Sequence, residues 1–112
     1  MTILDVAEIL KGQILVQGEA VNVDFKHVVA SDLMSDVLLV DEEDILLLTS
    51  LASDQVIRTA QIIGAVGIIV VNGKSLPSSM AEIAKDLGIT LGCCEHSKYD
   101  ACVAIHEALK TS

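Results

Sequence analysis

Short apolar runs, separated by segments with helix start and stop signals, constrain the fold of this chain more than any other feature. The runs at residues 45–49 (ILLLT) and 67–71 (GIIVV) are too short for helices between their boundaries, and each is typical of a buried strand. Between them, Ser53 and Asp54 are placed to cap a helix that Gly64 ends. Strands that alternate with helices of about ten residues predict an α/β fold with a largely parallel sheet flanked by helices.

The same alternation continues toward both ends of the chain. We expect helices over residues 3–10, 34–40, 54–63, 79–87 and about 98–109, and further strands over residues 13–17, 26–31 and 89–93. Residues that start or end helices stand at these boundaries: Thr2 and Ser97 as N-caps, Pro77 and Ser78 in a first turn, and Gly12 and Gly88 after a last turn. A chain of 112 residues can bury one sizeable core, so we expect a single small domain over residues 1–112.

Composition predicts a folded, soluble protein. Apolar residues make up 52% of the chain and the mean hydropathy is positive, which excludes intrinsic disorder. The longest apolar run, at residues 65–71, is far shorter than the roughly 20 residues of a membrane-spanning helix. No basic segment followed by an apolar stretch opens the chain, so we expect no secretory signal, no membrane partner and a cytoplasmic location.

The charge balance argues against a nucleic-acid partner. The chain has 16 acidic and 7 basic residues, a formal net charge of −9, and no basic stripe that would bind a phosphate backbone. Phe25 and Tyr99 are the only aromatic residues, so platforms for stacking the bases of a single strand are also missing. The apolar residues nevertheless exceed what a small domain usually buries, which predicts a self-association surface and a homodimer.

Two Ser-Asp pairs stand four residues apart in the stretch ASDLMSDVL, residues 30–38. As paired carboxylates, Asp32 and Asp36 could serve acid–base or metal chemistry if both lay on one helix face. In the alternative, helix capping, oxygens of Ser31 and Asp32 accept the free N–H groups of the next helix, and Asp36 lies favourably in its first turn. We favour capping, because Ser-Asp after a strand suits it and adjacent exposed carboxylates rarely acquire separate pKa values.

Residues 72–75 (NGKS) resemble the end of a phosphate-binding loop. The complete loop needs a glycine, four residues and then Gly-Lys-Ser or Gly-Lys-Thr, so that its N–H groups surround the phosphates. Gly67 is one residue too far upstream of Gly73, and we therefore interpret the segment as a polar turn between a strand and a helix. Such a turn ahead of a helix N-terminus can still hold a small anion.

The residues Cys93, Cys94, His96, Cys102 and His106 form a cluster of potential metal ligands. Cys102 and His106 lie four residues apart, as two ligands on one helix face would. However, adjacent cysteines on a strand point to opposite faces, and neither CxxC nor HExxH spacing is present. We therefore expect no metal, and cysteines that pack as small apolar residues. Cysteine catalysis would need an exposed thiolate beside a base, which no spacing here predicts.

A succession of segments resembles the DRTGG-domain family. In order and with similar spacing, and over nearly the whole chain, these segments are SDLMSDVL (31–38), DILLLTS (44–50), GAVGIIVVNG (64–73), AKDLGITL (84–91) and EHSKYDAC (95–102). The family is similar to the N-terminal domain of HPr kinase/phosphorylase and, more distantly, to the N-terminal domains of Mur ligases, so the resemblance implies an α/β fold of that kind. Where the family has Thr-Gly-Gly, this chain has Lys26, His27 and Val28, so a ligand bound there would meet larger side chains.

The resemblance implies a non-catalytic regulatory or interaction module, without catalytic residues or a cofactor. We expect a homodimer that senses a small anionic or nucleotide ligand. Ligands of parallel α/β sheets bind at the carboxyl ends of the strands. The polar residues expected at those ends, and therefore predicted to bind the ligand, are Ser31, Asp32, Thr49, Ser50, Asn72 and Gly73.

Two other functions stay open at this level. The acidic composition also fits an adaptor subunit with a protein partner in a larger redox or kinase complex. The cysteines and histidines near the C-terminus also fit a small metal-dependent or cysteine-dependent enzyme.

Overall fold

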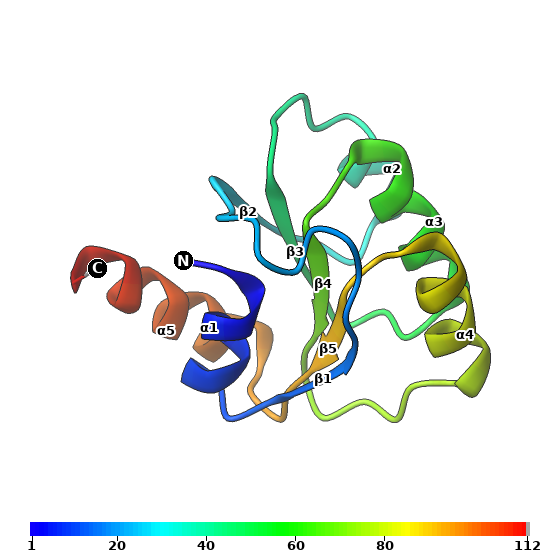
Figure 1. The fold of residues 1–112 in the computed structure, drawn as a ribbon. Coiled ribbons are helices and arrows are strands. Elements are labelled where there is room, and N and C mark those ends of the chain that lie inside the picture. Colours follow the sequence, from blue (N-terminus) through cyan, green and yellow to red (C-terminus); the bar gives the residue numbers. More distant parts are fainter. Residues whose placement is uncertain (112) are drawn as a thin grey trace.

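Five strands form one sheet, and helices cover both of its faces (Figure 1). The structure is a computed structural model, and it describes residues 1–111. In chain order the elements are α1 (Ile3–Ile9), β1 (Gln13–Val16), β2 (His27–Ala30), α2 (Met34–Val37), β3 (Ile45–Thr49), α3 (Asp54–Ile63), β4 (Gly67–Val70), α4 (Ser78–Leu87), β5 (Leu91–Cys93) and α5 (Lys98–Thr111). The predicted alternation of strands and helices is confirmed.

The strand order is β1-β5-β4-β3-β2, and each neighbouring pair except β1–β5 is parallel. All residues of β3 and β4 are buried, because these strands lie inside the sheet with helices over both faces. This burial explains why their sequences are continuously apolar rather than alternating. The predicted fold class, α/β with a largely parallel sheet, is confirmed.

Each face of the sheet has its own apolar core. Successive strand residues point to opposite faces, and in β3 this places Ile45 and Leu47 in the core beneath α2, α3 and α4. Leu46 and Leu48 lie in the other core, beneath α1 and α5. Burying one such side chain contributes about 1.5–3 kcal/mol, so β3 stabilises both layers at once.

Several helices begin and end at the residues that the sequence marks. Thr2 forms a capping box with Asp5: the Thr2 amide donates to Asp5 Oδ2 (2.8 Å), and the Asp5 amide donates to Thr2 Oγ1 (3.5 Å). Gly64 and Gly88 end α3 and α4 in the left-handed conformation, with φ of 69° and 68°. Ser97 Oγ accepts the Asp100 amide at the start of α5 (3.1 Å), as an N-cap does.

Some boundaries differ from the prediction. Beyond Leu38, backbone amides bond to carbonyls three residues back, as Leu39 N does to Asp36 O (3.1 Å), so α2 tightens and stops before residue 40. Ser53 occupies the N-cap position of α3, but its side chain makes no capping bond. The other differences are small: α1 ends at Ile9, β1 ends at Val16, β2 spans His27–Ala30, β4 ends at Val70, α4 begins at Ser78, β5 begins at Leu91 and α5 ends at Thr111. Within residues 1–111, no helix combines the length and the apolarity needed to span a bilayer.

Candidate functional site

Asp32 lies where the carboxyl ends of the parallel strands meet, and it joins three segments. Its Oδ1 accepts hydrogen bonds from Thr49 Oγ1 (3.0 Å) and the Ser50 backbone N–H (2.7 Å), at the end of β3. Its Oδ2 accepts from Ser50 Oγ (2.6 Å) and from Nζ of Lys98 (2.7 Å), the first residue of α5. One carboxylate therefore connects the loop after β2, the end of β3 and the start of α5. We name Asp32, Thr49, Ser50 and Lys98 the Asp32 junction.

The prediction that Asp32 caps the next helix is wrong. The N-cap of α2 is Leu33, and no side chain makes a capping hydrogen bond there. Ser31 Oγ accepts the Leu33 amide (3.1 Å), which forms a local turn rather than a cap. Asp36 does lie in the first turn of α2, as predicted. Asp32 instead bonds to the junction, because an ammonium group and three further donors stabilise a carboxylate more than helix amides do.

The junction keeps Asp32 ionised. Partial burial raises the pKa of the carboxyl group, but hydrogen bonds from Lys98, Ser50 and Thr49 outweigh burial and hold the pKa well below its usual range. The Asp32 side chain is still 43% exposed, so water screens part of its attraction to Lys98. The two oxygens accept four hydrogen bonds, which is the full capacity of a carboxylate. The junction therefore presents a satisfied negative charge, which disfavours an anion at that point.

Asn72 and Gly73 follow β4, and their backbone amides bond to the loop after β5. Asn72 N donates to His96 O (2.7 Å), and Gly73 N donates to Cys94 O (2.9 Å). Both residues have positive φ, the left-handed conformation that favours glycine, and a Cβ on Gly73 would also force the carboxylate end of the Glu95 side chain to shift. The Gly73 amide that a phosphate loop would direct at its ligand is therefore already in use.

The predicted ligand-binding residues lie in two places. The first group comprises Ser31, Asp32, Thr49 and Ser50, and the second group comprises Asn72 and Gly73. Of the first four, only Asp32, Thr49 and Ser50 are hydrogen-bonded to one another. In both groups the hydrogen bonds described above run between parts of the chain itself. Ligand binding at these six residues stays a prediction.

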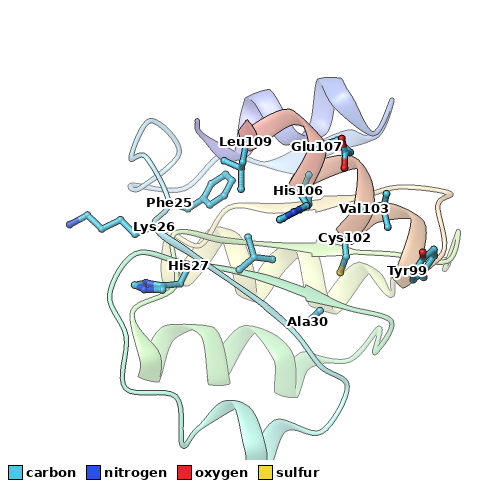
Figure 2. A pocket seen from close by; sticks show the side chains of 12 residues that line it. Phe25, Lys26, His27, Ala30, Tyr99, Cys102, Val103, His106, Glu107 and Leu109 are labelled. Carbon is cyan, nitrogen blue, oxygen red and sulfur yellow. The ribbon is translucent and has the colours of Figure 1, made fainter. Parts of the chain in front are cut away.

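A groove with a volume of about 820 Å³ lies between β2 and α5 (Figure 2). Val28 and Ala30 line it from β2, and Cys102, Val103 and His106 line it from α5. The imidazole of His106 points from α5 toward β2 (Figure 2). The groove exists because α5 covers the inner strands on this face of the sheet and leaves the β2 side open.

Both aromatic residues of the chain line this groove, although they are 74 residues apart in sequence (99 minus 25). Phe25 is buried beside the Leu109 end of α5, and Tyr99 lies at the opposite end of that helix (Figure 2). Tyr99 is 76% exposed, so its ring is accessible to a ligand.

Three basic side chains, Lys26, His27 and His106, also line the groove. Residues 41–44 (DEED) form an acidic turn before β3 that lies beside two of them. Lys26 Nζ is 3.5 Å from Asp44 Oδ2, and His27 Nε2 is 3.2 Å from Glu42 Oε2. These contacts are largely solvent-exposed and hold the side chains weakly. Lys26, His27 and Val28 therefore line the groove, which stays open with these side chains in place.

The five candidate metal ligands near the C-terminus are not brought together. Cys93 ends β5 and Cys94 is buried directly after it, whereas Cys102 and His106 lie on α5. Within residues 1–111, no three His, Cys, Asp or Glu side chains are placed to hold one ion. Burial raises the pKa of the Cys93 and Cys94 thiols, and the charge of Glu95 raises both further. The two thiols are therefore poor nucleophiles at neutral pH.

Sequence reasoning does not find Lys98 or the groove. Lys98 lies 66 residues from Asp32, and β5, which leads to Lys98, is not a neighbour of β2 in the sheet. The available signal is weak: a lysine shortly after a strand end stands at the same edge as an aspartate after another strand end. Only the course of α5 across the sheet brings the two charges together.

No protein-family model matches this sequence, and no curated protein matches it either. Among solved structures, the chain is similar to the CBS and DRTGG domains of the regulatory region of Clostridium perfringens pyrophosphatase, complexed with the activator diadenosine tetraphosphate. The TM-score is 0.76 at 17% sequence identity, and the match covers 93% of this chain and 45% of that chain. This chain therefore spans less than half of the pyrophosphatase region. At this identity the similarity shows a common fold, the α/β fold of a domain within a regulatory region.

Proposed function

We propose that this chain is a non-catalytic regulatory module of the DRTGG kind, which senses a small anionic ligand of the nucleotide class and acts as a homodimer. The observation that carries the proposal is the groove between β2 and α5. It gathers both aromatic side chains, three basic side chains and one acidic side chain, Glu107, in a chain whose net charge is −9. This concentration favours a ligand that has both a flat ring and negative charge. The nucleotide activator of the structurally similar pyrophosphatase region supports the same ligand class.

The size and chemistry of the groove suit such a ligand. Its volume of about 820 Å³ lies within the range of roughly 300–1,000 Å³ that is typical of small-molecule sites. A base that stacks on the exposed Tyr99 ring would gain about 1–3 kcal/mol. Lys26 is 64% exposed beside Asp44, so a phosphate group can compete for its ammonium. His106 projects into the space between these two positions.

The state of the reactive groups supports a binding role rather than a catalytic one. The Asp32 carboxylate accepts four hydrogen bonds from the chain, so it is poorly suited to act as a general base. The raised pKa values of Cys93 and Cys94 keep both thiols protonated at neutral pH.

Ligand binding is tested by thermal shift and calorimetry with adenosine, AMP, ATP, diadenosine tetraphosphate and inorganic phosphate. We expect the nucleotides to raise the melting temperature. Adenosine and phosphate should act more weakly, because adenosine lacks the negative charge and phosphate lacks the aromatic base. Tyr99→Ala should lower nucleotide affinity about 10-fold. Leu39→Ala, at an 81% exposed position near α2, should leave affinity unchanged. A flat response to the whole panel would overturn the ligand part of the proposal.

The homodimer is tested separately by light scattering across a concentration series. We expect a dimer at micromolar concentration, because the excess of apolar residues predicts a self-association surface. A strict monomer over that range contradicts this part of the proposal and leaves ligand binding unaffected.

A further inference from the structure

β2 is an edge strand whose outer side is open. In the part of the chain that the structure describes, its one strand neighbour is β3. His27 and Ala30, the first and last residues of the strand, are both exposed. An accessible strand edge pairs readily with a strand of another molecule.

Val28 and Ala30 of β2 direct their backbone N–H and C=O groups away from β3. The amides of His27 and Ser31 donate to carbonyls on the β3 side, at 3.4 and 3.0 Å. Backbone groups of successive strand residues alternate in direction, so those of Val28 and Ala30 point outward. The open edge therefore offers two N–H and two C=O groups to a partner strand.

We propose that a second copy of this chain pairs with β2 in antiparallel orientation, with Val28 of each copy opposite Ala30 of the other. Val29 of both copies then lies at a twofold axis perpendicular to the sheet, and two five-stranded sheets join into one of ten strands. This interface specifies the homodimer of the proposed function and rests on that part of it.

Charge complementarity supports this register. With Val28 opposite Ala30, Lys26 stands opposite Asp32 of the second copy, and the twofold axis repeats the pair. Lys26 is 64% and Asp32 43% exposed, and because the Asp32 oxygens already accept four hydrogen bonds within the chain, the pair acts through charge attraction across the interface rather than through a new hydrogen bond. Lys26 and Asp32 flank β2 in each copy, Lys26 lines the groove and Asp32 bonds to Lys98 of α5, so both side chains lie on the face of the sheet that α5 covers. The two pairs offset part of the repulsion between chains that each carry a net charge of −9.

The two other antiparallel registers that pair the outward groups lack this complementarity. Val28 opposite Val28 would place Lys26 opposite Ala30. Ala30 opposite Ala30 would set the apolar Val28 against the Asp32 carboxylate. Neither register brings opposite charges together, so both leave the repulsion between two acidic chains uncompensated.

The same pairing joins the two grooves. Because the twofold axis is perpendicular to the sheet, both α5 helices lie on one face of it, and the grooves adjoin across the axis. Val28 and Ala30 of both copies then form a shared floor. The exposed apolar side chains on α5, Val103 and Leu109, each 40% exposed, flank this common space.

The backbone pairing is tested with two substitutions at one position. Val28→Pro removes an outward N–H and keeps the hydrogen bonds to β3, as proline does on edge strands. Val28→Thr keeps the N–H and the β-branched shape, and it is the matched control. By light scattering we expect Val28→Thr to dimerise like the parent chain and Val28→Pro to self-associate at least 10-fold more weakly. Lys26→Glu should also weaken the dimer, because it sets two carboxylates opposite each other.

The register is tested by cross-linking. Val29 faces itself at the axis in a non-hydrogen-bonded pair, where Cα atoms lie about 4.5 Å apart, within the range of a disulfide. Val29→Cys should therefore give a covalent dimer under mild oxidation. Ala30→Cys, whose counterpart is Val28, should not, and the parent chain controls for its three native cysteines.

The outcomes separate the interface from the proposed function. A monomeric parent chain overturns both the homodimer and this interface. A dimeric parent whose Val28→Pro variant still dimerises, and whose Val29→Cys variant does not cross-link, overturns the interface and leaves the homodimer standing. If circular dichroism shows that Val28→Pro is unfolded, the cross-linking of Val29→Cys decides between these outcomes.

Discussion

The Asp32 junction and the groove both involve β2 and α5, yet their polar groups are used differently. In the junction, each carboxylate oxygen of Asp32 accepts two hydrogen bonds from the chain itself. In the groove, Tyr99 is 76% exposed and His106 points into open space. The difference shows that residues typical of catalysis can serve structure once the fold satisfies them, whereas a binding surface needs groups that the fold leaves accessible.

The two regions are mechanically connected through α5. Lys98, the first residue of this helix, belongs to the junction, and Cys102 and His106 further along line the groove. The junction therefore positions the helix that forms one wall of the groove. A change in the junction is expected to act on both stability and ligand affinity, whereas a change in the groove should act on affinity alone.

The largest expected effect on stability comes from Asp32→Ala. This change leaves the Lys98 ammonium and the fully buried Thr49 hydroxyl without their acceptor. We expect a loss of about 1.5 kcal/mol in the free energy of unfolding, after allowance for solvent screening of the half-exposed carboxylate. Asp36→Ala, the matched change in the second Ser-Asp pair, should cost less than about 0.5 kcal/mol. Urea unfolding of both variants measures the difference, and equal losses would contradict the junction.

The pH dependence of stability should report the same carboxylate. The folded-state pKa of Asp32 lies below its ordinary value of 3.8, so its contribution is complete above about pH 5 and is lost progressively as the pH falls through 3.8 toward the folded-state pKa. The stability difference between the parent chain and Asp32→Asn should therefore be largest between about pH 5 and 7 and shrink below about pH 4. Urea midpoints from pH 7 to pH 2.5 measure it. A difference that stays constant over this range would argue against an ionic junction.

A substitution in the groove should lower ligand affinity and leave the free energy of unfolding nearly unchanged. His106→Ala removes a side chain that projects into the groove, so we expect nucleotide affinity to fall about 10-fold while the free energy of unfolding changes by less than about 0.5 kcal/mol. His96→Ala lies outside the lining of this groove and is the matched control. Calorimetry and urea unfolding of the same samples test this separation, which fails if both variants lose affinity equally.

The smallest expected effect is the reactivity of the thiols after β5. Burial raises the pKa of Cys93 and Cys94, so iodoacetamide should label them more slowly at pH 7 in the folded chain than in urea. Mass spectrometry of labelled peptides gives the two rates. Fast labelling of either cysteine in the folded chain would restore the thiol-dependent enzyme as a candidate.

Local sequence signals predicted the elements better than the contacts between them. The runs ILLLT and GIIVV form strands, and Gly64 and Gly88 end their helices, because a short apolar run between turn residues and a glycine after a last helical turn are signals carried by neighbouring residues. The prediction for Asp32 is wrong because it uses only such local signals. Capping by the nearest helix is the best local use of a Ser-Asp pair, and the donor that changes the outcome, Lys98, lies 66 residues away.

The amino-acid sequence by itself determined the α/β class, the largely parallel sheet, the order of its elements and most of their boundaries. These properties follow from hydrophobic periodicity and from residues that start or end helices, which act over a few neighbours. Only the tertiary structure decided that Asp32 binds Lys98, that Phe25 and Tyr99 line one groove, and that β2 lies at an open edge. Those properties depend on strand order and on the course of α5 over the sheet, which bring distant residues together and leave no local pattern in the chain.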